Sequence, residues 1–420
     1  MTALVINCII GGGIFGVPGE LTRLLGRASP LAMIFAALGM AVIMACIAEV
    51  ASQFSESGGP YLYVRTAFGR FVGMQIGWFH MLGDMATAAA LASLFVSYLT
   101  TFLRWQPNAW ERSFLIAVVI GIPTAANYLG IRSGANLSNL MTLAKLSPLA
   151  VLILFGMAHF AQQPQTIHMS ELAAPGLSNW VRAMVFLLFT FGGWEGALIP
   201  TGEIREPART IPFGLTAGLV ACAVTYMLLQ FVTVVTIGTK MTDAPLPEVA
   251  SILLGRSGVA FVTVAALVSI YGWISGAILY APRLAYALAA QGDFPTVFAR
   301  LHSRFHTPGA AIVMYAFTAW VLASSGTFLK IVPLCSGFMT VYYAATCASL
   351  IPLRKLRPDA DRLRVPLGPL LSVLGVAISL ALMTGLKTGE LLLMGFTAAI
   401  ATTNWLWAKR RRRRLLPPPG

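Results

Sequence analysis

The stretch that decides the fold is IIGGGIFGVPG, residues 9–19, which places five glycines and one proline within an apolar segment. Each glycine costs ~1 kcal/mol relative to alanine in a helix interior, so we do not expect a regular helix here. Unwinding would leave the N–H groups of Gly12, Gly13 and Ile14 at the start of a half-helix, where unpaired donors and the helix dipole favour a carboxylate. Close helix packing through small residues is the alternative. It fits less well, because a packing face needs glycine at every fourth position rather than three in a row.

The composition indicates that this segment belongs to a membrane protein. Among the 420 residues, 57% are hydrophobic, 10% are charged and the mean hydropathy is +0.77, whereas soluble domains carry about 25% charged residues. The net charge of +14 does not indicate nucleic acid as a partner, because Lys and Arg lie between the apolar runs rather than on one face. The five cysteines lie inside apolar runs without a CxxC pair, so neither a disulfide framework nor a metal site is expected.

We expect an all-α integral membrane protein, because apolar runs of ~20 residues are long enough to cross a bilayer. Twelve such helices are predicted, at about 1–25, 29–53, 69–103, 113–130, 136–159, 180–201, 211–238, 257–290, 309–324, 331–351, 367–386 and 390–408. The first lacks the basic start and A-x-A site of a cleavable signal peptide. With both termini cytoplasmic, nineteen of the 29 Lys and Arg residues lie inside, nine outside and Lys145 within a span, which obeys the positive-inside rule. We expect a multi-pass protein of a prokaryotic inner (plasma) membrane.

A second interrupted span carries FTFGGWE, residues 189–195. Glycine-interrupted spans in corresponding places of two halves are typical of inverted-repeat transporters, which bind substrate at the broken helices. Five spans separate the two breaks, and a repeat unit with an odd number of helices reverses its orientation in the membrane. We therefore predict one transmembrane transporter domain with a 5+5 inverted repeat and broken helices 1 and 6. Its parts are a first repeat at about 1–159, a second at about 180–351, two extra helices at about 367–408 and a basic cytosolic tail at 409–420.

The residues of the second break suggest how it could bind an amino group. Carbonyls freed by unwinding could accept from a substrate ammonium. Phe189, Phe191 and Trp194 are aromatic enough to cover a small ligand, although an aromatic beside a membrane glycine more often only packs. Glu195 is a stronger candidate, because an acid inside a span costs at least ~2.5 kcal/mol and usually has a function.

Lys145 is the basic residue expected deep inside a span. It follows Arg132 by thirteen residues, or ~20 Å along a helix, which is too far for its side chain to reach the interface. Its charge needs acceptors, and the freed carbonyls of the first span are the nearest unpaired class. We therefore predict a bridge from Lys145 to span 1 that couples the two helices.

Two histidine pairs have spacings that can carry chemistry. His80 and Asp84 lie at positions i and i+4 of one predicted span, so they share a face. A buried structural pair is favoured there over a proton relay. His302 and His306 lie in a basic loop without a cysteine or carboxylate ligand between them, so a metal site is not predicted.

The order of the motifs makes a family resemblance specific. Besides the two breaks, the chain carries SGGPYLY at 57–63 with AFG at 67–69, NYLGIR at 127–132 before TLAK at 142–145, an ExxxPxxxIP stretch at 203–212, and Pro282-Arg283 leading to Pro295. Together they cover roughly residues 5–310. With them the chain resembles the amino acid–polyamine–organocation (APC) superfamily of secondary transporters.

The resemblance implies a LeuT-like fold that holds an α-amino acid between spans 1 and 6. The contacts it implies are the backbone of Gly11, Gly12 and Gly13 for the carboxylate and the carbonyls of Ile9, Phe189 and Gly192 for the ammonium. It also implies that Phe189 is a gating aromatic and that Lys145 replaces the bound sodium of other members. Two features depart from the family pattern: Gly12 stands where relatives often have serine, and the chain starts almost at the break. Either the start is late, or the inner gate lacks part of its cover.

We therefore expect a secondary active transporter that moves a neutral α-amino acid by alternating access, through sodium-independent exchange or proton coupling. A cationic amino acid or polyamine antiporter is the alternative. A channel would need a continuous polar ring, and an enzyme would need clustered catalytic groups, so both are disfavoured. No cofactor is implied; the partners expected are the amino acid, protons and membrane lipids at the Lys409–Arg414 end. Valine at Gly12 or Gly13 is expected to abolish binding and leave the protein folded.

Overall fold

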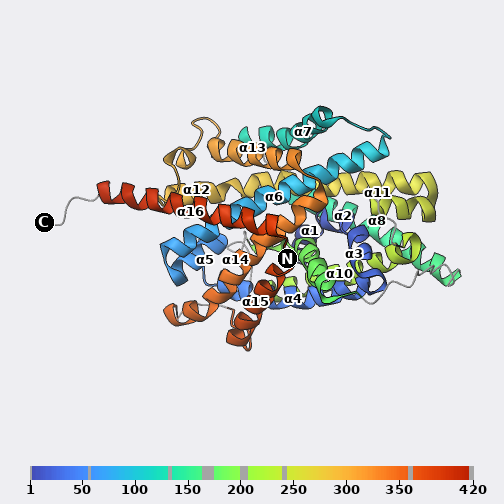
Figure 1. The fold of residues 1–420 in the computed structure, drawn as a ribbon, viewed down its shortest axis with the longest axis horizontal. Coiled ribbons are helices and arrows are strands. Elements are labelled where there is room, and N and C mark those ends of the chain that lie inside the picture. The colour runs from blue at the N-terminus through green and yellow to red at the C-terminus, as the bar shows by residue number, and fades with distance from the viewer. Residues whose placement is uncertain are drawn as a thin grey trace.

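The computed structural model describes residues 2–54, 58–130, 135–162, 175–198, 207–238, 244–357 and 363–415, and within these ranges the regular elements are all helices. Several long helices run side by side along the longest axis, which agrees with the predicted all-α class (Figure 1). The elements in chain order are α1 (Thr2–Ile9), α2 (Gly13–Gly16), α3 (Pro18–Leu25), η1 (Gly26–Ala28), α4 (Ser29–Ala51), α5 (Gly59–Phe68), α6 (Arg70–Phe102), α7 (Ala109–Tyr128), α8 (Ala135–Gln162), α9 (Leu177–Phe191), η3 (Trp194–Leu198), α10 (Pro207–Ile237), α11 (Pro245–Tyr280), α12 (Pro282–Ala290), η5 (Thr296–Ala299), α13 (Gly309–Ser325), α14 (Phe328–Leu356), α15 (Gly368–Met383) and α16 (Thr388–Leu415).

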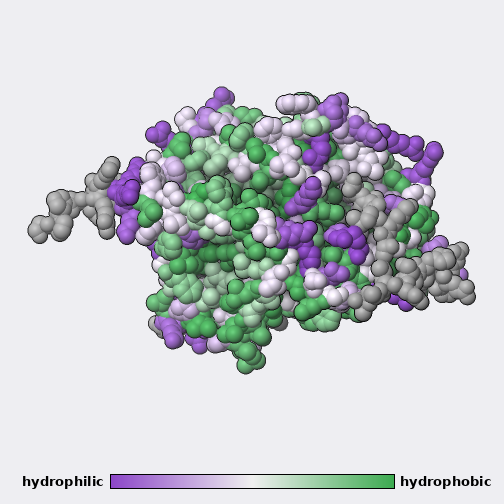
Figure 2. Space-filling model, in the orientation of Figure 1, coloured by the Kyte–Doolittle hydropathy of each residue, from purple (hydrophilic) through white to green (hydrophobic). Residues whose placement is uncertain are grey.

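Eight segments of the described chain are long and apolar enough to cross a membrane. They are Pro18–Ala51, Arg70–Phe102, Ala109–Tyr128, Lys145–Gln162, Thr210–Ile237, Pro245–Ala290, Phe328–Leu356 and Thr388–Arg411. Two shorter apolar helices, α13 and α15, add to these. Large apolar side chains on the outer faces are exposed, including Leu38 on α4, Val220 on α10 and Phe396 on α16. Figure 2 shows a broad hydrophobic area over α4, α14 and α15, which is the kind of surface that lipid tails cover.

Both predicted helix breaks are confirmed. The first span stops at Ile9, where α1 ends, and resumes at Gly13, where α2 begins. The sixth predicted span stops at Phe191, and the described chain continues from Trp194 to Leu198 as the short 3₁₀ helix η3. Gly193 has φ +93°, a left-handed backbone conformation that favours glycine.

The segment between the second and third spans differs from the prediction. Residues 54–68 lie between two predicted spans, but residues 59–68 form α5, which starts with Pro60 in its first turn and ends before Gly69, at φ +88°. Proline is well tolerated there because the first turn leaves its N–H groups unpaired. A further helical segment precedes the eighth predicted span, since α11 begins at Pro245 and bends at Gly255, at φ +65°.

Two polar clusters connect the ends of neighbouring helices through hydrogen bonds and ion pairs. Glu49, buried at the end of α4, accepts from Arg354 of α14 at 2.6 and 2.7 Å and from the Val365 N–H at 2.8 Å. The second cluster centres on the buried Asp293.

Asp293 joins four parts of the chain. Its carboxylate accepts from Tyr61 of α5 at 2.7 Å and pairs with Arg70 at the start of α6, while Asn404 of α16 donates to its carbonyl at 2.6 Å. Burial and the hydrogen bond to Asp293 raise the pKa of the Tyr61 hydroxyl, so that it remains a donor at neutral pH. The cluster fixes α5 and the end of α12 beside the central cavity.

Candidate functional site

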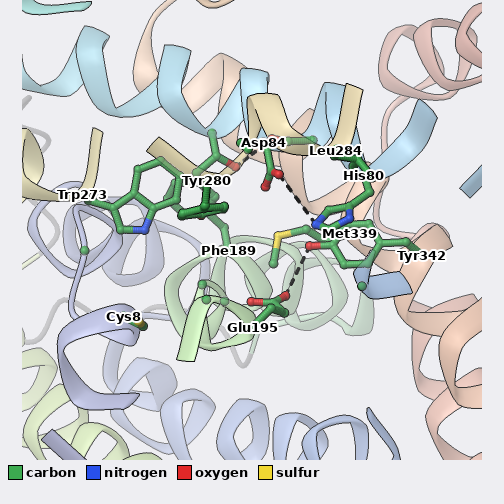
Figure 3. Close-up of a pocket in the computed structure, with 18 of the residues that line it drawn as sticks. Cys8, His80, Asp84, Phe189, Glu195, Trp273, Tyr280, Leu284, Met339 and Tyr342 are labelled. Carbon is green, nitrogen blue, oxygen red and sulfur yellow. Dashed lines mark hydrogen bonds and ion pairs between the residues drawn. The ribbon is translucent and has the colours of Figure 1, made fainter. Parts of the chain in front are cut away.

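The two helix breaks face one cavity of about 200 Å³ in the middle of the bundle. Gly11, Gly12 and Gly13 line it from the first break, and Phe189 and Gly192 line it from the second. The opposed helices α6, α11, α12 and α14 complete the wall. Figure 3 shows Trp273 and Cys8 on one side of the cavity, and His80 and Tyr342 on the other. The breaks approach so closely that a Cβ on Gly193 would lie 2.8 Å from the Cys8 carbonyl oxygen.

Side chains from other helices satisfy the carbonyls that the first break frees. Tyr226 of α10 donates to Ile9 O at 3.1 Å, Ser269 of α11 donates to Gly11 O at 3.0 Å, and Tyr98 of α6 donates to Phe15 O at 2.6 Å. Such partners are what allow irregular backbone at membrane depth. The sequence did not predict these donors, because a single Tyr or Ser in an apolar span has no distinctive spacing.

The carbonyl oxygen of Ile9, which the resemblance implies as an ammonium contact, already has two donors within the protein. Ile9 O accepts from the N–H of Gly11 at 2.8 Å as well as from the hydroxyl of Tyr226. A carbonyl oxygen has two lone pairs, so both acceptor positions of Ile9 are used within the protein. The ammonium contact implied for Ile9 would therefore have to displace one of these donors, and it stays a prediction; Ile9 does line the cavity.

Lys145 of α8 makes the predicted contact with the first span. Its ammonium donates to Asn7 O at 3.2 Å, on the N-terminal side of the break, and the residue is 3% exposed. Lys145 is not part of the cavity lining. The bridge is thus confirmed as a contact, and its role in coupling stays a prediction.

Close packing explains the glycines of the first break at least as well as ligand access does. A Cβ on Gly13 would lie 2.8 Å from the backbone Cα of Thr190 in α9, which cannot move aside without shifting that helix. A Cβ on Gly12 would meet the flexible end of Leu91 at 2.2 Å. The glycines of the first break therefore serve helix packing and also line the cavity, because α2 and α9 touch at the cavity wall.

At the second break, carbonyl and carboxylate groups face the cavity. Phe189 O accepts from Gly192 N at 3.2 Å and keeps a second lone pair, and the Phe189 ring packs edge-on against Phe328 with centroids 5.8 Å apart. Glu195 lines the cavity and accepts from the hydroxyls of Tyr342, at 3.3 Å, and Tyr343, both on α14.

Three predicted binding residues lie outside the cavity lining. Ile14, Phe191 and Trp194 are each 0% exposed. Phe191 packs against Tyr226 with ring centroids 5.2 Å apart, and Trp194 stacks on Tyr343 at 6.1 Å. They are core residues beside the break, because the chain turns their side chains away from the cavity that Phe189 and Glu195 face.

The structure adds residues that the sequence did not assign to the site. His80 and Asp84, which were interpreted as a structural pair, both line the cavity, as do Trp273 and Tyr280 of α11. Their helices are apolar on most faces, so periodicity could not show which residues point inward. Outside the site, His302 Nδ1 accepts from the Arg304 N–H at 3.2 Å and stabilises its loop.

Parts of three motifs lie outside the described residues. These are Ser57, Ile131 with Arg132, and residues 203–206 of the ExxxPxxxIP stretch. Most of the described remainder of these motifs lies in α5, α7, α8 and α10.

Comparison with known proteins identifies the family. A family model described as amino acid permease matches residues 1–407. The chain is 27% identical to the serine/threonine exchanger SteT of Bacillus subtilis over 391 residues, which cover 89% of this chain and 86% of the relative. It is 26% identical to the human b(0,+)-type amino acid transporter 1, covering 93% and 82%, and 25% identical to the methylthioribose transporter of Bacillus subtilis, covering 92% and 87%. The chain belongs to the amino acid permease family of membrane transporters.

Proposed function

We propose that this protein is a secondary active transporter that carries a neutral α-amino acid through the cavity between its two helix breaks. The observation that carries the proposal is the meeting of both breaks on that one cavity. A zwitterion needs donors for its carboxylate and acceptors for its ammonium. The half-helix that begins at Gly13 offers backbone N–H groups without helical partners, and the carbonyls of Phe189 and Gly192 offer acceptors.

Twelve spans in a LeuT-like 5+5 inverted repeat are part of the proposal, and the packing of the helices supports it. If α1, α4, α6, α7 and α8 correspond to α9, α10, α11, α13 and α14, the contacts should be unchanged when the two sets are exchanged. The contacts follow this rule. Helix α1 packs on α10 as α9 packs on α4, and α1 packs on α8 as α9 packs on α14. Likewise α8 packs on α11 as α14 packs on α6.

A second correspondence supports the same repeat. In the first half, α5 has proline in its first turn and ends before Gly69, which is followed directly by α6. In the second half, residues 245–254 also start with proline and end before the bend at Gly255, after which α11 continues. The two short helices occupy the same position in each proposed half. On this scheme α15 and α16 are additions that pack against α14.

We place both termini and the ends of α5, α12 and α14 on the cytoplasmic side of a prokaryotic inner membrane. The positive-inside rule supports this orientation. At the C-terminal end of α16, Lys409 lies over the Trp405 ring at 4.7 Å and Arg411 over Trp407 at 5.5 Å. Aromatic rings beside basic groups suit the interface with anionic lipid headgroups.

Sodium-independent exchange is the proposed mode, with protons as the alternative coupling ion. The bridge from Lys145 to Asn7 O supports it, because the ammonium supplies a fixed positive charge beside the unwound backbone. The printed name of the Bacillus subtilis relative, an exchanger, agrees with this mode. A change in the protonation of Lys145 would loosen the bridge and give protons a route into the cycle.

One observation favours the alternative of a cationic amino acid or polyamine. The sequence offered no second acid beside Glu195, but the fold brings Asp84 of α6 into the same cavity wall. Asp84 has His80 as a neighbour, with Nε2 and Oδ2 3.7 Å apart. His80 already lies beside this carboxyl group and would compete with a cationic ligand for it, so the neutral substrate remains the proposal.

Counterflow in proteoliposomes tests the function. Purified protein is reconstituted, the vesicles are loaded with unlabelled neutral amino acids, and uptake of a radiolabelled one is measured without sodium. We expect saturable uptake that internal substrate stimulates. Flux that rises linearly with concentration would indicate a channel, and conversion of the substrate to a product would indicate an enzyme. Competition by putrescine or cadaverine stronger than by any neutral amino acid would support the alternative.

A further inference from the structure

The cavity wall holds a polar pair that the carboxylate and ammonium of a substrate do not require. His80 and Asp84 lie one turn apart on α6 and line the cavity, and each side chain is 16% exposed. In Figure 3 the pair lies on the side of Tyr342, away from Trp273 and Cys8. A substrate held at the breaks by its backbone groups would turn its side chain toward such a wall.

His80 and Asp84 retain polar atoms that could form hydrogen bonds with a ligand. His80 Nε2 and Asp84 Oδ2 are 3.7 Å apart, which is too long for a hydrogen bond. The other ring nitrogen, Nδ1, is buried and has no partner among the described residues. The Tyr342 ring packs against the imidazole with centroids 4.7 Å apart, and Tyr315 donates to the Asp84 backbone carbonyl at 3.0 Å. The Tyr342 ring thus holds the imidazole in place, and the two side chains are near enough for an ion pair but too far apart for a direct hydrogen bond.

We propose that His80 and Asp84 form the subsite for the side chain of the transported amino acid, and that the substrate class is neutral amino acids with a hydroxyl or carboxamide group. An oxygen ~2.8 Å from both atoms fits over their 3.7 Å separation. A hydroxyl there donates to the Asp84 carboxylate and accepts from the His80 N–H. The inference rests on the proposed function, because it assumes that an amino acid occupies this cavity.

The geometry disfavours the other side-chain classes. An apolar side chain of the same shape would leave both buried groups without partners, which is costly at low dielectric. A cationic side chain would be attracted by Asp84 but would compete with His80 for the same carboxylate. A hydroxyl or carboxamide can act as donor and acceptor together, so it satisfies both residues.

Threonine and valine test the inference because they differ mainly by one hydroxyl. Affinity is measured by competition with labelled substrate in proteoliposomes containing the full chain. The wild type should bind threonine at least about tenfold more tightly than valine, since a site built for a hydroxyl rejects the analogue that lacks it. Asp84→Ala and His80→Leu should bring that ratio close to one and change valine affinity by less than about threefold, because valine makes neither hydrogen bond.

Conservative variants and a control separate recognition from folding. Asp84→Asn keeps an acceptor and His80→Gln keeps a donor, so both should retain a preference for threonine. Thr100→Val removes a hydroxyl from the same helix but outside the cavity lining, where that hydroxyl donates to Val96 O at 2.8 Å. Its threonine-to-valine ratio should therefore equal that of the wild type.

The outcomes distinguish the inference from the proposed function. A wild type that binds both amino acids without discriminating would overturn the inference alone. So would variants that weaken threonine and valine equally, which would mean that the pair only supports the fold. A wild type that prefers lysine to threonine would instead support the cationic alternative, and it would overturn the neutral substrate of the proposed function together with this inference. Failure of the wild type to bind any amino acid would overturn the proposed function, and this inference with it.

Discussion

Lys145 is a charge that the protein holds at membrane depth with a backbone acceptor. Its ammonium reaches Asn7 O, one of several carbonyls near the first break that side chains from neighbouring helices satisfy. A buried ammonium without an acceptor would be strongly unfavourable. The carbonyl of Asn7 supplies that acceptor, and we predict that this contact links the conformation of span 1 to α8.

Removing that charge should stop transport. Lys145→Met keeps the length of the side chain and loses the donor to Asn7 O, so we expect transport to fall at least about tenfold, and Lys145→Ala should do the same. Uptake by the wild type, Met and Ala variants is measured in sodium-free buffer. Lys330→Met, at an exposed position near the start of α14, is the control and should remain active. A fully active Met variant, or a wild type that requires sodium, would remove Lys145 from the mechanism.

The structure changes the expectation for the glycines of the first break. Valine there was expected to block binding and leave the protein folded, but Gly13 faces the backbone of Thr190 and Gly12 faces a flexible leucine end. We now expect Gly13→Ala to lower the yield and thermal stability of the purified protein more than Gly12→Ala, because a helix must shift to make room. Size-exclusion profiles and melting curves measure this. Equal stability of the two variants would show that α2 and α9 can separate without cost.

At the scale of elements, a few buried ion pairs decide how the helix ends meet. Glu49 of α4 is 0% exposed and binds Arg354 of α14 through both carboxylate oxygens. Since it also accepts from the Val365 N–H, it fixes the chain that enters α15. Three helices thus depend on one carboxylate.

Glu49→Gln should destabilise this junction. The amide keeps the shape but removes the charge and one acceptor, leaving the Arg354 guanidinium and the Val365 N–H poorly paired, which we expect to cost about 2 kcal/mol. A melting curve in detergent should show the lower midpoint. Arg23→Gln is the matched control, because its partner Glu20 lies at 2.5 Å but Arg23 is 49% exposed, and such pairs contribute little. A midpoint unchanged from the wild type would mean that packing alone holds α4 to α14.

At the scale of the whole molecule, the cavity reaches toward one end of the bundle. Its lining continues from the breaks to Gly59 and Pro60 of α5 and to Arg283 and Ala287 of α12. These elements lie at the same end as the C-terminal part of α16 (Figure 1). If the protein works by alternating access, as we propose, the described conformation is the state whose cavity is directed toward the proposed cytoplasmic side.

Cysteine labelling should report which side the cavity faces. Cys8 lines the cavity, whereas Cys46, Cys222, Cys335 and Cys347 are buried. A membrane-impermeant thiol reagent should therefore add one label per chain when applied from the proposed cytoplasmic side, and a bound amino acid should slow the reaction. Cys8→Ser should remove the label, as mass spectrometry would show. Labelling only from the opposite side would reverse the proposed orientation.

The sequence by itself determined the class of protein and the places where its helices break. Both follow from local physics: the length of an apolar run fixes whether it can cross a bilayer, and consecutive glycines weaken a helix wherever they occur. Motif order then indicated the family, and the depth of Lys145 indicated that it needs a backbone acceptor.

Only the tertiary structure decided which residues face the cavity. Phe191 and Trp194 are buried in the core, and Ile9 O accepts two hydrogen bonds within the protein. His80 and Asp84 of α6 line the same cavity as Glu195. The reason is that a membrane helix is apolar both toward lipid and toward its neighbours, so the sequence carries little signal about its rotation. Rotation is set by packing between helices far apart in the chain, and the side-chain chemistry of the cavity depends on it.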